Sequence, residues 1–237
     1  MTHAAQVEPP EVVRLPDAGG AILSAFGVTK RWRRNQAPIL DGLDFELPRG
    51  SLIGLQGANG AGKTTFLRIL AGLFLPDSGS VSLDGLDPVR QRRAYQRRLG
   101  FVAAGQGALY ARMSVKGHLE YWARLALLPP GDRRTAVELA LGQFDLLPLA
   151  GNRVDRLSTG QRQRVRLAMG FLHGPDVVLL DEPGNSLDEA GLDRLHSVID
   201  DFRGSGKTVL WCGPSVRNLG LELDALHELV DGKLVRL

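Results

Sequence analysis

Short apolar segments separated by turn residues make up the first hundred positions of the chain. From Ala21 onward, the segments ILSAFGV, LDFEL and SLIGLQ have a strand-like pattern, and we predict a β-strand in each. A glycine-rich turn follows SLIGLQ, and the next segment, TTFLRILAGLF, has apolar residues at helical spacing. Short strands are expected again at VSLDG and GFVAA. The first hundred residues therefore predict several strands with one helix among them.

The middle of the chain has a helical pattern instead. We expect one helix in SVKGHLEYWARLALL, ended by the two prolines at 129–130, and a second helix in DRRTAVELALGQF. A third helix is expected from Ser158, whose side chain can cap it, to about His173. After it, DVVLLD and TVLWC are predicted strands around a helix at about 187–202. A short helix and the hairpin LHELVDGKLV are expected to follow.

This order of elements predicts an α/β fold with a mainly parallel sheet, into which a helical subdomain at about residues 112–172 is inserted. Residues 1–20 are rich in Ala, Pro, Glu and Gly without a period, so we expect a flexible tail there. The folded domain is then predicted to span residues 21–237. The composition, 43% hydrophobic and 23% charged, is typical of globular proteins and excludes a disordered or fibrous chain.

We find no pattern of an export signal or a membrane span, and we expect no direct membrane insertion. The longest apolar runs, such as DVVLLD, are much shorter than the ~20 residues that cross a bilayer. The N-terminus lacks a basic segment followed by an apolar one. Cys212 is the only cysteine, so no internal disulfide can form. Its apolar neighbours predict an unreactive buried thiol, which suits a reducing cytosol.

The charge of the chain is nearly balanced, at +3 with a pI of about 9.3, so we expect no nucleic acid partner. Basic residues gather in two clusters, and neither has the series of aromatic residues that single-strand binding needs. Each cluster is either a solvated surface or a site that attracts anionic lipid headgroups or an acidic partner. The clusters are Lys30, Arg31, Arg33 and Arg34, and Arg90, Arg92, Arg93, Arg97 and Arg98.

Residues Gly57 to Thr64 read GANGAGKT, which fits the phosphate-binding pattern G-x-x-x-x-G-K-[ST] with an apolar strand before it and a helix after it. Glycines let the backbone curl so that its N–H groups point at phosphate oxygens, and the helix adds a partial positive charge. Lys63, which we expect on an open loop, would reach the β- and γ-phosphates, and the Thr64 hydroxyl would bind Mg²⁺. The predicted ATP contacts are Gly57, Ala58, Asn59, Gly60, Ala61, Gly62, Lys63, Thr64 and Thr65.

Two adjacent acids, Asp181 and Glu182, end the apolar run VVLLDEP. Ligands gather at the carboxyl edge of parallel sheets, where the phosphate-binding turn also lies, so Asp181 can hold Mg²⁺ directly or through water. Because side chains alternate along a strand, we expect Glu182 to point away from Asp181. There it can accept a proton from the water that attacks the γ-phosphate. A capping pair of acids before a turn is the structural alternative.

The segment LSTGQRQRV, from Leu157 to Val165, indicates which kind of nucleotide protein this is. Together with the phosphate-binding turn and VVLLDEP, and in the same order, it resembles the LSGGQ signature of ABC ATPases, with Thr159 in place of a glycine. The resemblance covers the chain from about Ala21 onward. It implies a P-loop NTPase core with a mainly parallel sheet, an N-terminal antiparallel β subdomain and an inserted α-helical signature subdomain.

The resemblance also implies that two subunits enclose two ATP molecules head to tail. Ser158, Gly160 and Gln161 would then contact the γ-phosphate bound by the other subunit, and Asp188 would communicate across the dimer. Trp32 matches the aromatic residue that stacks on adenine upstream of the phosphate-binding turn. A buried core tryptophan is the alternative, although the charged neighbours of Trp32 favour an exposed ring.

Two positions depart from the family pattern. The family has a Mg²⁺-binding glutamine after the strand at GFVAA, where counting along this sequence gives Ala104 or Gly105, and Gln106 just beyond them can serve as the ligand. The family also has a histidine that contacts the γ-phosphate, and Pro214 stands in its place. Proline offers no imidazole and no N–H, and losing one such donor typically lowers a rate ~10²–10³-fold. We therefore predict slow hydrolysis, or hydrolysis at a composite site completed by a different partner.

These patterns predict an ATPase that uses ATP and Mg²⁺, with Glu182 as the catalytic base. It would dimerise on ATP with a second ABC subunit and power a separately encoded integral membrane permease from the cytoplasmic face of the cell membrane. The stretch LYARMSVKGHLEYWARL resembles exporters whose membrane subunit is encoded separately, so we expect an exporter. Pro214 leaves a second hypothesis, a regulatory ABC module with weak catalysis that clamps a protein or nucleic acid through ATP-gated dimerisation.

Overall fold

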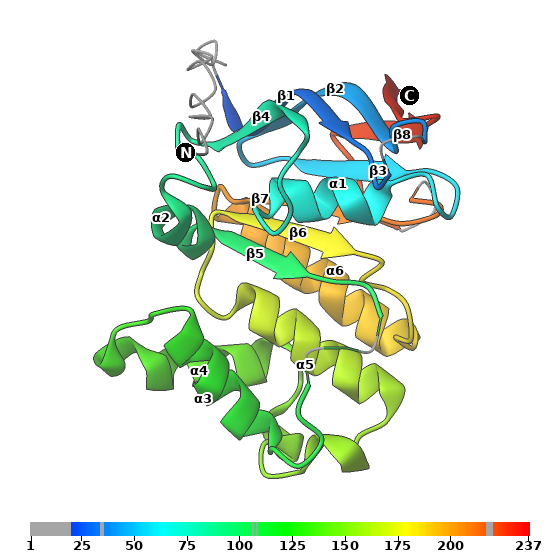
Figure 1. Ribbon diagram of the computed structural model, residues 1–237. Helices are drawn as coiled ribbons and strands as arrows, with labels where there is room; N and C mark the ends of the chain where they lie inside the picture. Colours follow the sequence, from blue (N-terminus) through cyan, green and yellow to red (C-terminus); the bar gives the residue numbers. More distant parts are fainter. Residues whose placement is uncertain (1–19, 34–35, 106, 108, 217–219) are drawn as a thin grey trace, which may run out of the picture.

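Two β-sheets and the helices packed on them make up the protein in the computed structural model (Figure 1). The structure describes residues 20–33, 36–105, 107, 109–216 and 220–237, so nearly all of the predicted tail lies outside the described residues. The strands are β1 (Ala21–Lys30), β2 (Leu40–Pro48), β3 (Leu52–Gln56), β4 (Ser78–Leu83), β5 (Leu99–Val102), β6 (Val177–Asp181), β7 (Thr208–Cys212), β8 (Ala225–Val230) and β9 (Lys233–Arg236). The helices are α1 (Lys63–Leu70), α2 (Arg92–Arg97), α3 (Val115–Leu125), α4 (Pro130–Gln143), α5 (Thr159–Phe171) and α6 (Glu189–Gly204), with 3-10 turns η1 (Leu147–Leu149) and η2 (Val154–Arg156).

The larger sheet brings the carboxyl ends of its central strands to one edge. Its strand order is β5-β6-β7-β3-β8-β9, in which the pairs from β5 to β8 are parallel and β9 forms an antiparallel hairpin with β8. The strands β3, β6 and β7 are apolar runs in which nearly every residue is buried, as expected for parallel strands covered on both faces. The segments that follow β3, β6 and β7 therefore meet at the same edge.

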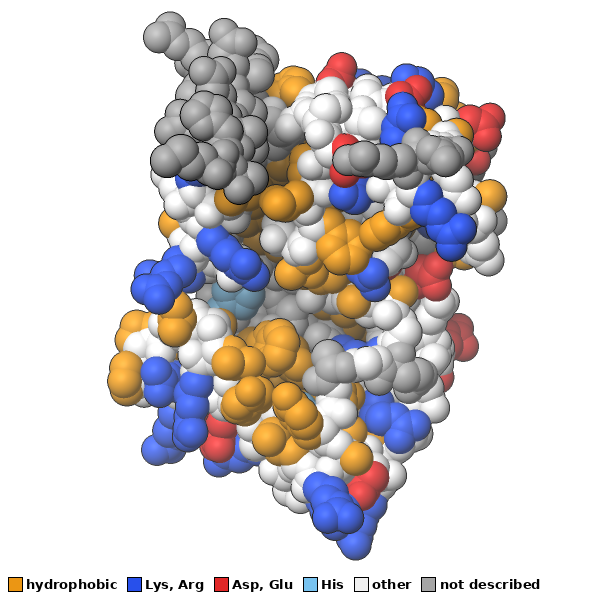
Figure 2. Space-filling model, in the orientation of Figure 1, with side chains coloured by type: hydrophobic (Ala, Val, Ile, Leu, Met, Phe, Trp, Pro, Cys, Tyr) orange, Lys and Arg blue, Asp and Glu red, His pale blue; other side chains and the backbone are white. Residues whose placement is uncertain are grey.

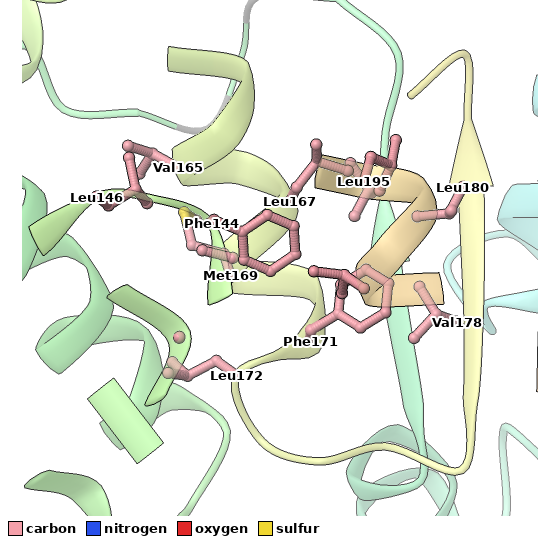
Figure 3. Close-up of a cluster of buried hydrophobic side chains, with 14 of the residues drawn as sticks. Phe144, Leu146, Val165, Leu167, Met169, Phe171, Leu172, Val178, Leu180 and Leu195 are labelled. Atoms are coloured by element: carbon pink, nitrogen blue, oxygen red, sulfur yellow. The ribbon is translucent and has the colours of Figure 1, made fainter. Parts of the chain in front are cut away.

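Different layers cover the two faces of this sheet. On one face, α1 and the smaller antiparallel sheet, with the order β2-β1-β4, share a core with Val177 and Leu179 of β6. On the other face, Val178 and Leu180 share a core with α5, α6 and Phe171 (Figure 3). The alternation of side chains along β6 thus divides them between two cores.

The helices α3, α4 and α5 lie on the far side of the sheet from β1 (Figure 1), within the span predicted as the helical insert. The helix α5 approaches β5 very closely, because a Cβ atom added at Gly100 would collide with the carbonyl oxygen of Gly170. A Cβ atom at Gly170 would in turn collide with the side chain of Val102. Both positions thus have to be glycine for the helix and the strand to pack this closely.

The predicted α/β class, with one antiparallel and one mainly parallel sheet, is confirmed, but some local predictions are wrong. The helix α3 ends at Leu125, before the prolines, and Pro130 begins α4, where its missing N–H costs no helical hydrogen bond. The short helix expected after TVLWC falls partly outside the described residues, at 217–219, and the described residues of that segment, 213–216 and 220–224, are not helical. The helix α2 was not predicted, because its six residues contain a single buried side chain, Tyr95.

Within the ranges that the structure describes, no helix is both long enough and apolar enough to cross a membrane. Cys212 is fully buried at the end of β7, as predicted. Burial raises the pKa of its thiol above the ordinary value, so the thiolate does not form at neutral pH. Cys212 is therefore a core residue.

Among the described residues, one member of each basic cluster forms ion pairs with acidic residues. Lys30 pairs with Asp77 at 2.8 Å, whereas Arg34 lies outside the described residues. Arg98 forms ion pairs with two aspartates. The other four arginines of the second cluster are exposed around α2, and they make no ion pair in the described part of the chain. They are Arg90, Arg92, Arg93 and Arg97.

Candidate functional site

The segment between β3 and α1 curls through glycines with left-handed backbone angles. Gly57, Gly60 and Gly62 have φ angles of 152°, 83° and 108°. A Cβ atom at Gly57 would also lie 2.6 Å from the carbonyl oxygen of Leu229, so a side chain there would meet backbone. The helix α1 begins directly after the curl, at Lys63, and directs the positive end of its dipole into it. This geometry is suited to binding phosphate oxygens through backbone N–H groups.

The prediction that Lys63 lies on an open loop is wrong. Lys63 is the first residue of α1 and is only 6% exposed. Its Nζ donates hydrogen bonds to the carbonyl oxygens of Gly57 (2.7 Å) and Ala58 (3.0 Å). Because these two acceptors belong to the phosphate-binding turn, the Lys63 side chain crosses the inside of the turn. Its positive charge is held where an anion would enter.

Asp181, the last residue of β6, is a buried carboxylate. Its side chain is 1% exposed, and neither carboxylate oxygen has a hydrogen-bond partner among the described residues. Burial raises the pKa of Asp181 above its ordinary value; the Thr64 hydroxyl and the Ala104 backbone N–H lie close enough to oppose this shift without forming a hydrogen bond. A carboxylate oxygen and a hydroxyl are ligands that suit Mg²⁺, which usually keeps several water ligands and binds nucleotide phosphates. These residues fit a magnesium ion.

The expected direction of the Glu182 side chain was based on alternation along a strand, and this reason is wrong. The strand β6 ends at Asp181, and Glu182 has a left-handed φ of 51°, so strand alternation no longer sets the direction of its side chain. Its backbone N–H donates to the carbonyl oxygen of Cys212 (2.8 Å). Its Oε2 accepts a hydrogen bond from Nδ2 of Asn185 (2.6 Å). The turn after β6, anchored to β7, therefore positions this carboxylate.

The start of α5 forms a capping box. The Oγ of Ser158 accepts a hydrogen bond from the Gln161 backbone N–H (3.1 Å), and Oε1 of Gln161 accepts one from the Ser158 N–H (2.9 Å). A Cβ atom at Gly160 would lie 2.8 Å from the carbonyl oxygen of Ser186, in the turn after Glu182. No hydrogen bond or ion pair in the described part of the chain joins Ser158, Gly160 or Gln161 to the phosphate-binding turn of the same chain.

Trp32 and Asp188 are the first and the last of the predicted site residues in the sequence. Asp188 caps α6, and its side chain accepts a hydrogen bond from the Gly191 backbone N–H (2.9 Å). Trp32 is 56% exposed and meets the ring of Phe74 edge to face, with ring centroids 5.6 Å apart. The alternative of a core tryptophan is therefore wrong, and the exposed ring is confirmed.

The two positions that depart from the family pattern lie beside the same sheet edge. Ala104 and Gly105 follow β5, and Gln106, the predicted third Mg²⁺ ligand, lies outside the described residues. Pro214 follows β7 and is exposed, and the neighbouring Gly213 N–H donates to the carbonyl oxygen of Leu55 (3.1 Å). Pro214 brings no hydrogen-bond donor to this edge.

Two side chains that sequence reasoning did not select hold the turn after Asp181. One is Asn185, which contacts Glu182. The other is Gln163 of α5, which is buried and donates from Nε2 to the carbonyl oxygen of Pro183 (2.8 Å). Gln163 lies four residues before the buried Leu167, so the helical period carries a signal for it. Asn185 has no such signal in the sequence.

Comparison with known proteins decides the family. The family profile described as ABC transporter matches residues 40–185, which is more than half of the chain. The chain belongs to the ABC transporter family. This ABC ATPase is 31% identical to the ABC transporter ATP-binding protein NatA of Bacillus subtilis over 193 residues, which cover 81% of the chain and 78% of NatA.

Other relatives have names that state different substrates. The chain is 34% identical to the probable multidrug ABC transporter ATP-binding protein YbhF of Escherichia coli over 81% of its length, but it spans 33% of YbhF. It is 40% identical to the phosphonates import ATP-binding protein PhnC 1 of Natronomonas pharaonis over 75% of the chain and 76% of that protein. A solved ATP-binding subunit of an ABC transporter has the same fold, with a TM-score of 0.82 at 23% identity over 91% of this chain and 90% of that one.

The family assignment gives the coarse function. ABC ATPases bind and hydrolyse ATP, and their ATP-binding subunits dimerise and work with membrane permease components. This chain is therefore the ATP-binding subunit of a transport system.

Proposed function

We propose that this subunit binds ATP with Mg²⁺, closes head to tail on a second ABC subunit, and hydrolyses ATP to drive a separately encoded membrane permease. The observation that carries the proposal is the phosphate-binding turn beside Asp181, a buried carboxylate without a hydrogen-bond partner among the described residues. A triphosphate with its cation satisfies both, because the turn's N–H groups bind phosphate and the cation neutralises the carboxylate.

Within one subunit, the turn surrounds the phosphates and Lys63 neutralises the β- and γ-phosphates. The Thr64 hydroxyl and Asp181 hold Mg²⁺, which neutralises phosphate charge when it is bound. Gln106 is the proposed third ligand. Trp32 stacks on the base, which its 56% exposure leaves room for.

Hydrolysis requires both subunits. Glu182 accepts the proton of the attacking water, and the hydrogen bond from Asn185 orients its carboxylate. The Oγ of Ser158 already accepts a hydrogen bond from Gln161, so its hydroxyl hydrogen is free to donate to the γ-phosphate of the other subunit. Gly160 and Asp188 lie at the same interface in this arrangement.

Pro214 makes this subunit a slow ATPase, or one that works mainly at a composite site with a different ABC subunit. The position after β7 is where a donor to the γ-phosphate would stand, and proline supplies none. The expected loss is ~10²–10³-fold in rate.

A groove of about 580 Å³ between the sheet and the helical layer is the proposed docking site of the permease. Apolar side chains line it, among them Leu73 and Leu125, which are 48% and 53% exposed, and Trp122. In Figure 2, hydrophobic side chains gather on both sides of the hollow in the middle of this face. Such a concentration of exposed apolar surface is typical of a protein contact.

The lining of the groove also indicates the character of the permease segment. Arg68 and Arg166 line it, and Nε of Arg166 is buried without a partner among the described residues. An apolar segment with an acidic side chain would therefore match it. The groove extends to Ala104, next to Asp181, so a bound segment would lie beside the cation site.

The direction of transport is proposed from the stretch Leu109–Leu125, which resembles exporters. The relatives' names include both a multidrug transporter and a phosphonate importer, so a transport assay with the native permease has to test it. We propose that the subunit sits at the cytoplasmic face of the cell membrane, held by the permease.

The variant Glu182→Gln tests the catalytic proposal. It should retain ATP binding and form an ATP-dependent dimer, while hydrolysis falls by at least ~10²-fold. Lys63→Met, which keeps much of the side-chain volume, should instead lose ATP binding. Calorimetry with Mg²⁺, phosphate release and light scattering measure the three properties. A folded wild-type protein that takes up no ATP at millimolar concentration would refute the proposal.

The variant Pro214→His tests the cause of slow turnover. Its steady-state rate of ATP hydrolysis should be about tenfold or more above the wild-type rate, because the histidine places a donor near the γ-phosphate. A wild-type rate already typical of ABC ATPases, lost in Glu182→Gln and unchanged in Pro214→His, would contradict the role given to Pro214.

The variant Leu125→Glu tests the groove. It should abolish recovery of the subunit with a membrane protein from the organism of origin. Leu147→Glu changes a side chain that is 59% exposed outside the groove, and it should have no effect. Equal recovery with both variants would move the permease contact elsewhere.

A further inference from the structure

Asp77 joins two segments that lie far apart in the sequence. Its Oδ1 accepts a hydrogen bond from Nζ of Lys30 (2.8 Å), and its Oδ2 accepts one from the backbone N–H of Arg31 (2.6 Å). Its own backbone N–H donates to the carbonyl oxygen of Thr29 (2.8 Å). The chain directly before Trp32 is therefore attached at three consecutive residues to the start of β4.

The charge of Asp77 is stable under physiological conditions. The hydrogen bond from Lys30, followed by that from the Arg31 backbone, holds the pKa of the Asp77 carboxyl below its usual range. The carboxylate is thus ionised at neutral pH, and both of its oxygens are used as acceptors. Such charge-assisted hydrogen bonds are stronger than neutral ones.

The ring of Trp32 has a second support. Phe74, in the loop after α1, meets it edge to face at an interplanar angle of 86°. The guanidinium of Arg68 lies 5.4 Å from the centre of the Phe74 ring. Nζ of Lys30 lies 6.0 Å from the centre of the Trp32 ring. Trp32 is thus exposed to solvent but is held by named contacts.

We propose that Asp77 and Phe74 are positioning residues that hold the Trp32 ring ready to stack on the base of the nucleotide. The inference rests on the proposed function, because it requires ATP at this site. An exposed ring on an unsupported loop would lose side-chain and backbone freedom on binding, and this loss would weaken affinity. The hydrogen bonds of Asp77 and the ring contact of Phe74 remove that freedom before ATP binds. The affinity of the protein for the base of ATP then depends on residues that do not touch the nucleotide.

The test compares two ligands of the full-length protein, ATP and inorganic tripolyphosphate, each with Mg²⁺. The variants Asp77→Ala and Phe74→Leu should each weaken ATP binding by about fivefold, and Trp32→Ala by about tenfold or more. Tripolyphosphate has no base, so its affinity should be unchanged in all three. Added to Trp32→Ala, the Asp77→Ala change should have no further effect.

A matched control and a spectroscopic signature separate positioning from general damage. Asp84 follows β4 as Asp77 precedes it, and it pairs with Arg49 and Arg98 away from Trp32. Asp84→Ala should leave ATP affinity at the wild-type value. In protein labelled with fluorotryptophan, Asp77→Ala and Phe74→Leu should shift or broaden the fluorine resonance of Trp32, which is assigned by its loss in Trp32→Phe.

Each remaining outcome overturns a defined claim. If Asp77→Ala and Phe74→Leu leave ATP affinity unchanged, or weaken both ligands equally, the positioning role is wrong. If wild-type protein binds tripolyphosphate as tightly as ATP, the base is not recognised and the inference also fails. If the wild type binds neither ligand, the proposed function itself fails, and this result is visible before any variant is made.

Discussion

At the scale of single residues, Asp181 is a buried acid that forms no ion pair with the residues that the structure describes. Its carboxylate is buried and has no hydrogen-bond partner in the described part of the structure. Because burial raises its pKa, the folded protein binds a proton at Asp181 more readily than the unfolded chain does. At neutral pH the ionised group therefore lowers the stability of the protein without ligand.

The variant Asp181→Asn should therefore be more stable than the wild type without nucleotide and bind ATP with Mg²⁺ more weakly. Removing an uncompensated buried charge should raise the melting temperature by roughly 2–4 °C for each kcal/mol gained at this chain length. Thermal melts with and without MgATP measure both effects. Asp176→Asn, which removes an ion pair with Arg98 (2.6 Å), should not raise the melting temperature. A lower melting temperature for Asp181→Asn than for the wild type would contradict the argument.

The sequence predicted which segments meet at the sheet edge better than it predicted how their side chains are oriented. The motif spacing predicts that the glycines of the turn, Lys63 and Asp181 serve one site, and the fold brings their segments to one sheet edge. It does not predict that Lys63 crosses the inside of the turn, because the carbonyl groups that hold it become available only when the turn has curled. It also does not predict the left-handed φ of Glu182, which glutamate rarely adopts.

At the scale of elements, the close contact between α5 and β5 joins the helical layer to the sheet. Gly100 and Gly170 allow it, because a side chain at either position would collide with the other element. Ser158 precedes α5 and Glu182 follows β6, so this packing also fixes where these two predicted site residues lie relative to each other. A substitution at this contact should therefore lower the free energy of unfolding.

The variant Gly100→Ala should lower the free energy of unfolding by about 1–3 kcal/mol, because the added methyl group cannot be accommodated without moving α5. The control is Gly142→Ala in α4, where an added Cβ atom meets nothing within 4 Å. It should instead raise the free energy of unfolding by about 0.5–1 kcal/mol, since alanine favours helix. Urea unfolding followed by circular dichroism measures both. Equal values for Gly100→Ala and the wild type would show that α5 is not packed this closely.

Elements with a strong apolar pattern were the ones that the sequence predicted. The strands β3, β6 and β7 are buried on both faces and read as continuous apolar runs, so their number and type were expected correctly. The helix α2 was missed because one buried side chain, Tyr95, gives no period. The end of α3 was misplaced because Leu127 adopts a left-handed φ of 58°, a conformation that leucine does not signal.

At the scale of the whole molecule, buried and partly buried histidines should make the free energy of unfolding depend on pH. Burial lowers the pKa of His118, His173, His196 and His227 below the ordinary value. The best-defined case is His118, whose Nε2 accepts a hydrogen bond from the Tyr110 backbone N–H (2.7 Å). A proton on that nitrogen would remove the acceptor. The neutral forms therefore belong to the folded state.

The free energy of unfolding should consequently fall as the pH drops below about 6.5, the value for histidine in an unfolded chain. Depressed folded-state pKa values give stability that is complete above this pH and is lost as the pH falls through them. Asp181 acts in the opposite direction, so urea unfolding is best compared at about pH 7.5 and about pH 5.5 in the Asp181→Asn protein. Equal or higher stability at the lower pH would show that these histidines are accessible in the folded protein.

The loop after α1 has neighbouring residues that belong to two different proposed binding sites. Leu73 lines the groove proposed for the permease, and the next residue, Phe74, supports the ring of Trp32. A permease segment bound in the groove would contact Leu73, and a purine stacked on Trp32 would bind next to the ring that Phe74 contacts. The two ligands would thus act on neighbouring residues of one loop. Thermodynamic reciprocity then requires that any gain in nucleotide affinity caused by docking be returned, by the same factor, as a gain in docking caused by the nucleotide.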